Sequence, residues 1–215
     1  MRPPQRCFDE VYHVGEPQAP ARRRSTSHEA WGLSVGADRG HWSSIRGGTS
    51  GGRLWAVRRK DGRQVCFVDM HGLVDRHWRS IVDKGRQRDW VRPGTVTQWC
   101  TSWWDDEWED TFTSCFDEEW MAVEEAEGVG GEVAEVSTWA PSEALRRRWR
   151  RWFDQDMDDV FAPTALAMAV FEDDGRQDGL WWEDEYDPVR YSAPRGGIFQ
   201  KRLPRMRFTR VAEGS

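Results

Sequence analysis

The sequence lacks long apolar runs. Across its 215 residues, no apolar stretch approaches the roughly 18 residues that a membrane-spanning helix requires. The first ten residues, MRPPQRCFDE, contain no apolar segment of the kind that directs secretion. We therefore expect a cytoplasmic protein without a membrane partner.

Cysteine pairs with metal-ligand spacing are also missing. The chain has no Cys-x-x-Cys, and its four cysteines lie far apart, at Cys7, Cys66, Cys100 and Cys115. This spacing indicates neither a zinc site nor a disulfide framework, so free buried thiols are the prediction. His71 and His77 are six residues apart and would point to different faces of a helix, which makes a metal hydrolase a weaker hypothesis. We expect no bound metal.

The sequence has no internal repeat, no long interdomain linker and no phosphate-binding loop. The glycine-rich stretch RGGTSGG, residues 46–52, lacks the Gly-Lys-Ser/Thr that such a loop requires. A length of 215 residues allows one sizeable core. We predict a single domain over residues 1–215, with residues 16–30 as an exposed loop.

Basic residues are absent from one long segment. Residues 93–140 hold 13 acids and no lysine or arginine, whereas residues 21–92 hold 16 lysines and arginines against 7 acids. Either the protein has two opposed charged faces, or these segments lie against each other and neutralise. The net charge of −6 argues against a general nucleic-acid binder.

Tryptophan, in contrast, is abundant, with 15 residues. Several of these rings stand among acids in residues 93–140, where complete burial is costly. This segment predicts an acidic hairpin-helix subregion with aromatic anchors, formed by Trp103, Trp104, Trp108, Phe112, Phe116 and Trp120. Such a surface suits binding to a basic partner or mimicry of DNA phosphates. The alternative is a hairpin and helix with one face in the core.

Hydrophobic periodicity predicts strands mixed with helices. The pair Asp61-Gly62 predicts a hairpin between residues 53–59 and 63–70. Further strands are expected at residues 7–14, 30–35, 95–104, 110–116, 132–140, 179–182 and 197–203. Helices are expected within 72–91, 117–128, 141–153 and 162–175, with a short helix or turn in 37–48. This order favours an α+β fold with mixed, largely antiparallel sheets and inserted helices.

Four short motifs carry a resemblance to a known family. VYHV, GLSVGADRGHW, DGLWW and SAPRGGIF together resemble the spaced pattern of the ADP-ribosyltransferase superfamily. The chain also resembles uncharacterised proteins of bacteriophages and prophages that share the late Trp-Trp…Ser-Ala-Pro-Arg-Gly segment. The resemblance implies a fold in which an early Tyr-His strand, a Gly-x-Ser strand and a late strand line one NAD cleft.

Carried onto this sequence, the resemblance implies the residues of that cleft. His13 would bind a ribose of NAD, Ser34 would hold the second-strand position, and Trp31 or Trp42 would stack on nicotinamide, with Arg46 nearby. The family's catalytic glutamate is not evident, because the late strand carries Arg195 and Gln200. Glu183 and Glu185, in the preceding loop, are the candidate catalytic acids, and Arg195 is a candidate anion ligand.

Two functional hypotheses follow. The first is an ADP-ribosyltransferase-like protein of phage or mobile-element origin that binds NAD and acts on a host protein or nucleic acid. The second is a non-enzymatic, acidic and tryptophan-rich inhibitor that resembles DNA in charge and binds a host factor. Either protein would work in the cytoplasm of the host cell.

Overall fold

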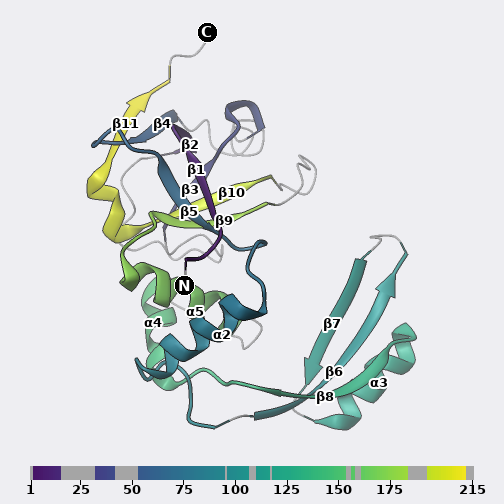
Figure 1. The fold of residues 1–215 in the computed structure, drawn as a ribbon. Helices are drawn as coiled ribbons and strands as arrows, with labels where there is room; N and C mark the ends of the chain where they lie inside the picture. The colour runs from purple at the N-terminus through teal and green to yellow at the C-terminus, as the bar shows by residue number, and fades with distance from the viewer. Residues whose placement is uncertain are drawn as a thin grey trace.

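The structure of the protein is a computed structural model. It describes residues 2–15, 32–41, 53–94, 96–106, 110–116, 118–153, 156–157, 161–183 and 193–211. The fold is a mixture of strands and helices, as the sequence predicts, with a large mixed sheet and a small antiparallel one (Figure 1). Within these residues, no helix combines the length and apolarity needed to cross a membrane.

The large sheet contains eight strands in the order β1-β5-β9-β10-β3-β2-β4-β11. Every neighbouring pair is antiparallel except β5 and β9, which are parallel. The strands are β1 (Gln5–Phe8), β2 (Val11–Val14), β3 (Gly32–Gly36), β4 (Leu54–Arg59), β5 (Val65–Asp69), β9 (Gly179–Trp182), β10 (Arg195–Phe199) and β11 (Met206–Arg210).

A short turn forces this sheet to curl. β4 and β5 are consecutive in the chain, yet four other strands lie between them in the sheet. Laid flat, that separation would be about 24 Å. Residues 60–64 span at most about 21 Å when extended, and they are folded into a turn in which Gly62 N donates to Arg59 O over 3.3 Å. The two ends of the sheet must therefore approach each other.

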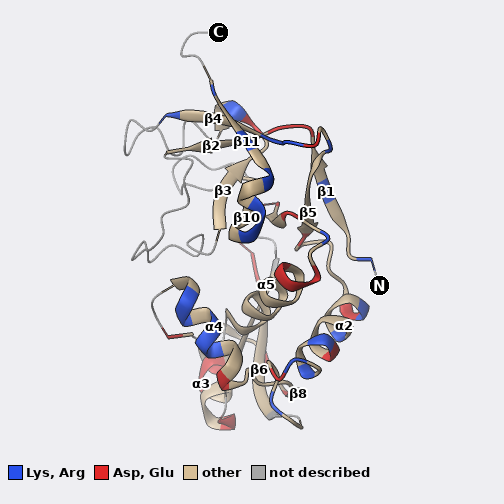
Figure 2. Ribbon diagram, turned by 90° about the vertical axis from the view of Figure 1, so that its left-hand side faces the viewer, with Lys and Arg blue, Asp and Glu red and all other residues tan. Residues whose placement is uncertain are grey.

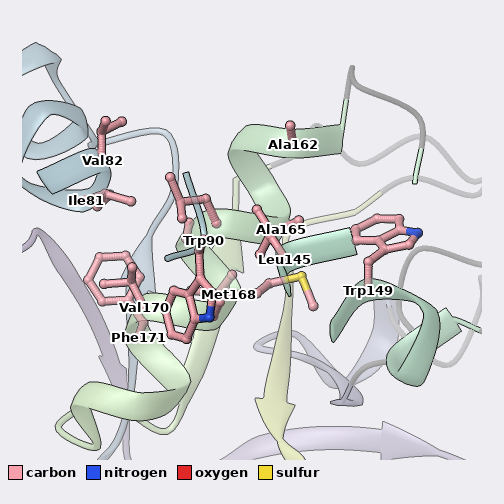
Figure 3. Packing of buried hydrophobic residues seen from close by; sticks show 14 of the residues in the cluster. Ile81, Val82, Trp90, Leu145, Trp149, Ala162, Ala165, Met168, Val170 and Phe171 are labelled. Atoms are coloured by element: carbon pink, nitrogen blue, oxygen red, sulfur yellow. The ribbon is translucent and has the colours of Figure 1, made fainter. Parts of the chain in front are cut away.

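Three helices pack against one face of the large sheet at β5, β9 and β10: α2 (Asp75–Arg86), α4 (Glu143–Phe153) and α5 (Ala162–Asp174). Helix α5 is apolar on most sides and lies in the centre of this layer, where nine of its residues are buried. It ends at Gly175, whose φ of 73° is a left-handed conformation that glycine adopts readily. Figure 3 shows the resulting core, in which side chains from α2, α4 and α5 meet.

The other face of the sheet has its own smaller core. It is built from side chains that alternate along the strands, with the 3-10 helix η2 (Gln200–Arg205) contributing Leu203 at the margin. Its buried members are Val11, Leu33, Val35, Val57, Val65, Phe67, Trp181, Ile198 and Met206. This second core is what the curled sheet encloses.

Residues 96–138 form a separate unit that we call the insertion lobe. It consists of β6 (Val96–Asp105), β7 (Asp110–Phe116), α3 (Glu119–Val129) and β8 (Glu132–Thr138), with the strands ordered β7-β6-β8. The chain enters and leaves it side by side, because Val91 pairs with Pro141 and Arg92 N donates to Ala140 O over 2.9 Å. In Figure 1 the lobe lies apart from the large sheet, at the lower right.

The predicted hairpin around Asp61-Gly62 is wrong. Residues 60–64 do form a turn, with Gly62 at a φ of 74°, but the flanking strands do not pair with each other. β4 pairs with β2 and β11, and β5 pairs with β1 and β9. A turn signal predicts a reversal of the chain, whereas strand partners are chosen by the side chains that each strand can bury.

The prediction of free thiols is also wrong. Cys7 and Cys66 are directly opposite each other on β1 and β5, and Cys100 and Cys115 are opposite on β6 and β7. Both pairs form disulfides, with Cα–Cα distances of 4.2 and 4.0 Å. The spacing of the cysteines in the sequence did not predict these pairs, because the register of the paired strands is what places the cysteines opposite each other. Disulfides persist in oxidising compartments, so the predicted cytoplasmic location would favour reduced thiols.

Most other elements agree with the sequence predictions. The pairing of β6 with β7, the helices and the strands β8 and β9 lie within a few residues of their expected positions. The expected strand over residues 7–14 is divided into β1 and β2, and the last expected strand ends at Phe199, where η2 begins. Strand β11 was not predicted, because the stretch MRFTR carries three polar residues in five.

Candidate functional site

The three strands expected to line a common cleft are neighbours. β2, β3 and β10, which carry His13, Ser34 and Arg195, lie side by side in the large sheet. His13 is buried, and its Nδ1 lies 2.8 Å from the backbone oxygen of Ser34. The histidine is therefore held against the backbone of β3.

The side chains of these strands do not converge. Arg195 is directly opposite Gly36 on β3, and Gly36 is opposite Tyr12 on β2. Because side chains alternate along a strand, Arg195 and Ser34 lie on the face of Tyr12, whereas His13 lies on the other face. The three strands are neighbours, but their register places His13 on the opposite face of the sheet from Ser34 and Arg195.

Glu183, a predicted catalytic acid, lies just after β9. Its Oε2 accepts a hydrogen bond from Trp181 Nε1 at 2.8 Å and lies 3.6 Å from Arg6 Nη2. The second predicted acid, Glu185, lies outside the described residues, as do the predicted cofactor-binding residues Trp31, Trp42 and Arg46. The NAD site thus stays a prediction.

A pocket of about 200 Å³ opens beside Glu183. It is lined by residues of β1, the segment after β3, the end of β9 with the residue that follows it, and the two residues before β10: Arg6, Phe8, Ala37, Asp38, His41, Trp181, Glu183, Ala193 and Pro194. His13, Ser34 and Arg195 do not line it. The residues of β1 and the pair Asp38 and His41 were not among the predicted site residues, because only the tertiary structure brings them close to the end of β9.

The insertion lobe has almost no interior. Of its described side chains, only Cys100, Thr101 and Ala122 are buried. Thr101 Oγ1 donates to the Ala122 carbonyl over 2.5 Å, which fixes α3 on one face of the small sheet. Of the nine exposed large hydrophobic side chains among the described residues, eight belong to the lobe: Trp104, Phe112, Trp120, Met121, Val123, Val129, Val133 and Val136.

Helix α3 presents a mixed apolar and acidic strip to solvent. Trp120, Val123, Glu124 and Glu127 are all exposed and follow the spacing i, i+3, i+4, i+7, which places them on one helix face. Ala122 is on the opposite side, against the sheet. Trp120 has 62% of its surface exposed, which is far more than the exposed fraction of a tryptophan packed in a core.

The charges of the lobe are not balanced within it. Helix α3 bears acids without a basic residue, whereas α2 and α4 carry lysines and arginines (Figure 2). The lysines and arginines of α2 and α4 instead pair with acids outside the lobe, in the part of the molecule that we call the body, as Lys84 does with Asp174 on α5. Opposed charged regions, one of the two predicted arrangements, agree better with this distribution than mutual neutralisation.

The arginine-rich helix α4 illustrates how the basic residues are used. The guanidinium of Arg148 contacts the rings of Trp90 and Trp152, with distances of 4.9 and 5.2 Å to the ring centroids. Burial opposes its charge, but hydrogen bonds to Asp173 and Glu172, at 2.7 and 2.6 Å, raise the pKa of Arg148 overall. This side chain therefore anchors α4 to α5.

His77, one of the two histidines considered for metal binding, has a structural contact. His77 Nδ1 accepts a hydrogen bond from the backbone of Val74 and caps the start of α2. Across the part of the chain that the structure describes, no three His, Cys, Asp or Glu side chains gather as metal ligands.

Comparison with known proteins adds no family to this description. No family model, no curated protein and no solved structure matches the chain.

Proposed function

We propose that the protein is a binding protein whose insertion lobe docks on a basic surface of another protein. The observation that carries this proposal is the composition of the lobe surface. Eight large hydrophobic side chains are exposed on a unit that has acids and no lysine or arginine. Exposed apolar patches rimmed by charge are characteristic of interaction sites.

The strip on α3 supplies the contacts for such an interface. Trp120 and Val123 offer apolar anchors, and Glu124 and Glu127 lie beside them on the same helix face. Tryptophan is among the residues that contribute most to binding when a partner buries them. The carboxylates select a partner with lysines or arginines around an apolar depression.

Charge also determines how the partner approaches. Residues 93–140 carry 13 acids without a base, so the lobe attracts basic proteins and repels nucleic acids at a distance. The nucleic-acid-binding face of another protein has the complementary charge. Binding there would block that face, as an inhibitor that resembles DNA in charge would do.

A protein array tests the proposal. Purified proteins with a pI above about 9, and an equal set of acidic ones, are probed with the wild type and with two lobe variants. The variants are Trp120→Ala/Val123→Ala and Glu124→Gln/Glu127→Gln, all at exposed positions. The control, Asp83→Asn/Glu143→Gln, removes two acids exposed on α2 and α4.

We expect the wild type and the control to retain a subset of the basic proteins. The Trp120 variant should lose at least about tenfold in affinity, and the glutamine variant should lose both affinity and salt dependence. The proposal is overturned if no basic protein is retained, or if the retained proteins bind both lobe variants as tightly as the wild type.

A further inference from the structure

The pocket beside Glu183 has the size of a site for one ring. Its volume of about 200 Å³ is below the range of about 300–1,000 Å³ that drug-sized ligands occupy. A complete dinucleotide is much larger than this volume. A ligand held here would be a single ring with one substituent.

Aromatic and small apolar side chains form one part of the wall. The rings of Phe8 and Trp181 lie 4.6 Å apart between centroids, and Ala37, Ala193 and Pro194 complete the apolar lining. Such surfaces accept flat rings, because aromatic pairs gain from offset or edge-to-face contact. This part of the pocket therefore suits an aromatic ring.

Carboxylates outnumber cations in the other part. Arg6 is engaged by two carboxylates, with Asp69 Oδ2 at 3.2 Å from its Nε and Glu183 Oε2 at 3.6 Å from its Nη2. Asp38 contributes a third carboxylate, whose Oδ1 caps the His41 backbone at 2.7 Å. Among the lining residues, the carboxylates of Asp38 and Glu183 therefore stand against the single guanidinium of Arg6, which also pairs with Asp69.

Only one of the two carboxylate oxygens of Glu183 takes part in the structural hydrogen bond. Oε2 accepts the Trp181 indole proton, and Oε1 takes no hydrogen bond from the residues that the structure describes. A carboxylate at the edge of an aromatic wall recognises planar cations well, because it accepts charge-assisted hydrogen bonds. The nearby ring adds attraction for the same cation.

We propose that this pocket binds a small organic cation built on one aromatic ring, with an amidinium or ammonium group directed to Glu183 and Asp38. This function is separate from that of the insertion lobe. The two can be tested independently, since none of the residues that line the pocket belongs to the insertion lobe.

Three probes of equal shape and different charge test the proposal: benzamidine, benzamide and benzoate. Each is titrated into the wild-type protein while the indole N–H signals are followed by NMR. The Trp181 signal, identified by its loss in Trp181→Phe, reports on the pocket because its proton is bonded to Glu183. Benzamidine should shift this signal and bind at least about tenfold more tightly than benzamide, and benzoate should not bind.

Two variants complete the test. Glu183→Gln keeps an acceptor for Trp181 and removes the charge, and Asp38→Asn changes an exposed side chain. Either should weaken benzamidine about fivefold or more and leave benzamide unchanged, whereas the control Glu143→Gln should change neither. The proposal is overturned if benzoate binds as well as benzamidine, if both variants bind benzamidine like the wild type, or if no probe moves the Trp181 signal.

Discussion

Asp178 is the most deeply buried acid among the described residues, with 1% of its surface exposed. Its carboxylate accepts hydrogen bonds from Arg59 Nη1 and from the Cys66 backbone, both at 3.0 Å. These two partners come from β4 and β5, the consecutive strands that do not pair. The carboxylate therefore joins the strands where the ladder of backbone hydrogen bonds cannot.

Replacing this acid should destabilise the protein strongly. Asp178→Ala leaves the Cys66 N–H and part of the Arg59 charge without a partner, so we expect the free energy of unfolding to fall by about 3 kcal/mol. Urea unfolding at pH 7 measures this loss. Asp61→Ala is the matched control, because Asp61 binds the same arginine at the surface. A loss with Asp178→Ala no larger than with Asp61→Ala would contradict this account.

Asp61 also gives a pH prediction. Its hydrogen bond with Arg59 lowers the pKa of Asp61 from 3.8 to about 2. Because the pKa is lower in the folded state, the stabilisation is complete above about pH 4 and disappears as the pH falls to about 2. The melting temperatures of the wild type and Asp61→Asn should therefore differ at pH 5 and converge near pH 2. A difference that persists unchanged at pH 2 would show that the charge of Asp61 is not responsible.

At the scale of elements, the late glycine pair has a packing role. In the sequence, the pair Gly196-Gly197 precedes the apolar residues Ile198 and Phe199. In the structure, Gly196 and Gly197 lie within β10, between β3 and β9. A Cβ on Gly196 would lie 2.6 Å from Trp181 Cε3 and 3.0 Å from Phe67 Cε1. Glycine is needed there because two aromatic rings occupy the space above the strand.

A pair of alanine substitutions checks this interpretation. Gly196→Ala should lower the free energy of unfolding by about 1–3 kcal/mol, because the added methyl group overpacks the core. Gly128→Ala, in α3, meets nothing within 4 Å and should stabilise the helix by up to about 1 kcal/mol. Thermal unfolding followed by circular dichroism compares the two, and equal effects would argue against the packing role of Gly196.

The elements that depend on residues close together in the chain were predicted correctly. Helix α5 was predicted because its apolar run ends at Gly175, and the β6–β7 hairpin because two alternating segments flank an acidic turn. The pairing of β4 with β5 was predicted wrongly, because the true partners of these strands are distant in the chain. The pocket was missed for the same reason, since Arg6 and Glu183 are separated by most of the sequence and meet only through the sheet.

At the scale of the whole molecule, the insertion lobe is joined to the body by a single pair of adjacent segments. The Val91–Pro141 bridge and the Arg92–Ala140 hydrogen bond form the base of this connection. Trp139 packs against the helical core and belongs to the body. The body therefore contains both of its cores without residues 96–138.

Removing the lobe should leave the body folded. Replacing residues 93–138 with Asn-Gly gives a three-residue loop between Arg92 and Ala140, a length that antiparallel pairs accept. We expect the melting temperature of the body to change by only a few degrees and benzamidine to bind as before, while the basic proteins retained by the wild type are lost. Calorimetry and the array measure these outcomes, and an unfolded product would show that the lobe is part of the body's core.

The sequence by itself determined the local structure and the unequal distribution of charge. Helix and hairpin patterns arise from neighbouring residues, and the absence of bases from residues 93–140 is a property of composition alone. Only the tertiary structure decided strand order, the two disulfides, the separation of His13 from Arg195 and the pocket beside Glu183. These depend on register, where a shift of one residue moves every side chain to the other face of a sheet.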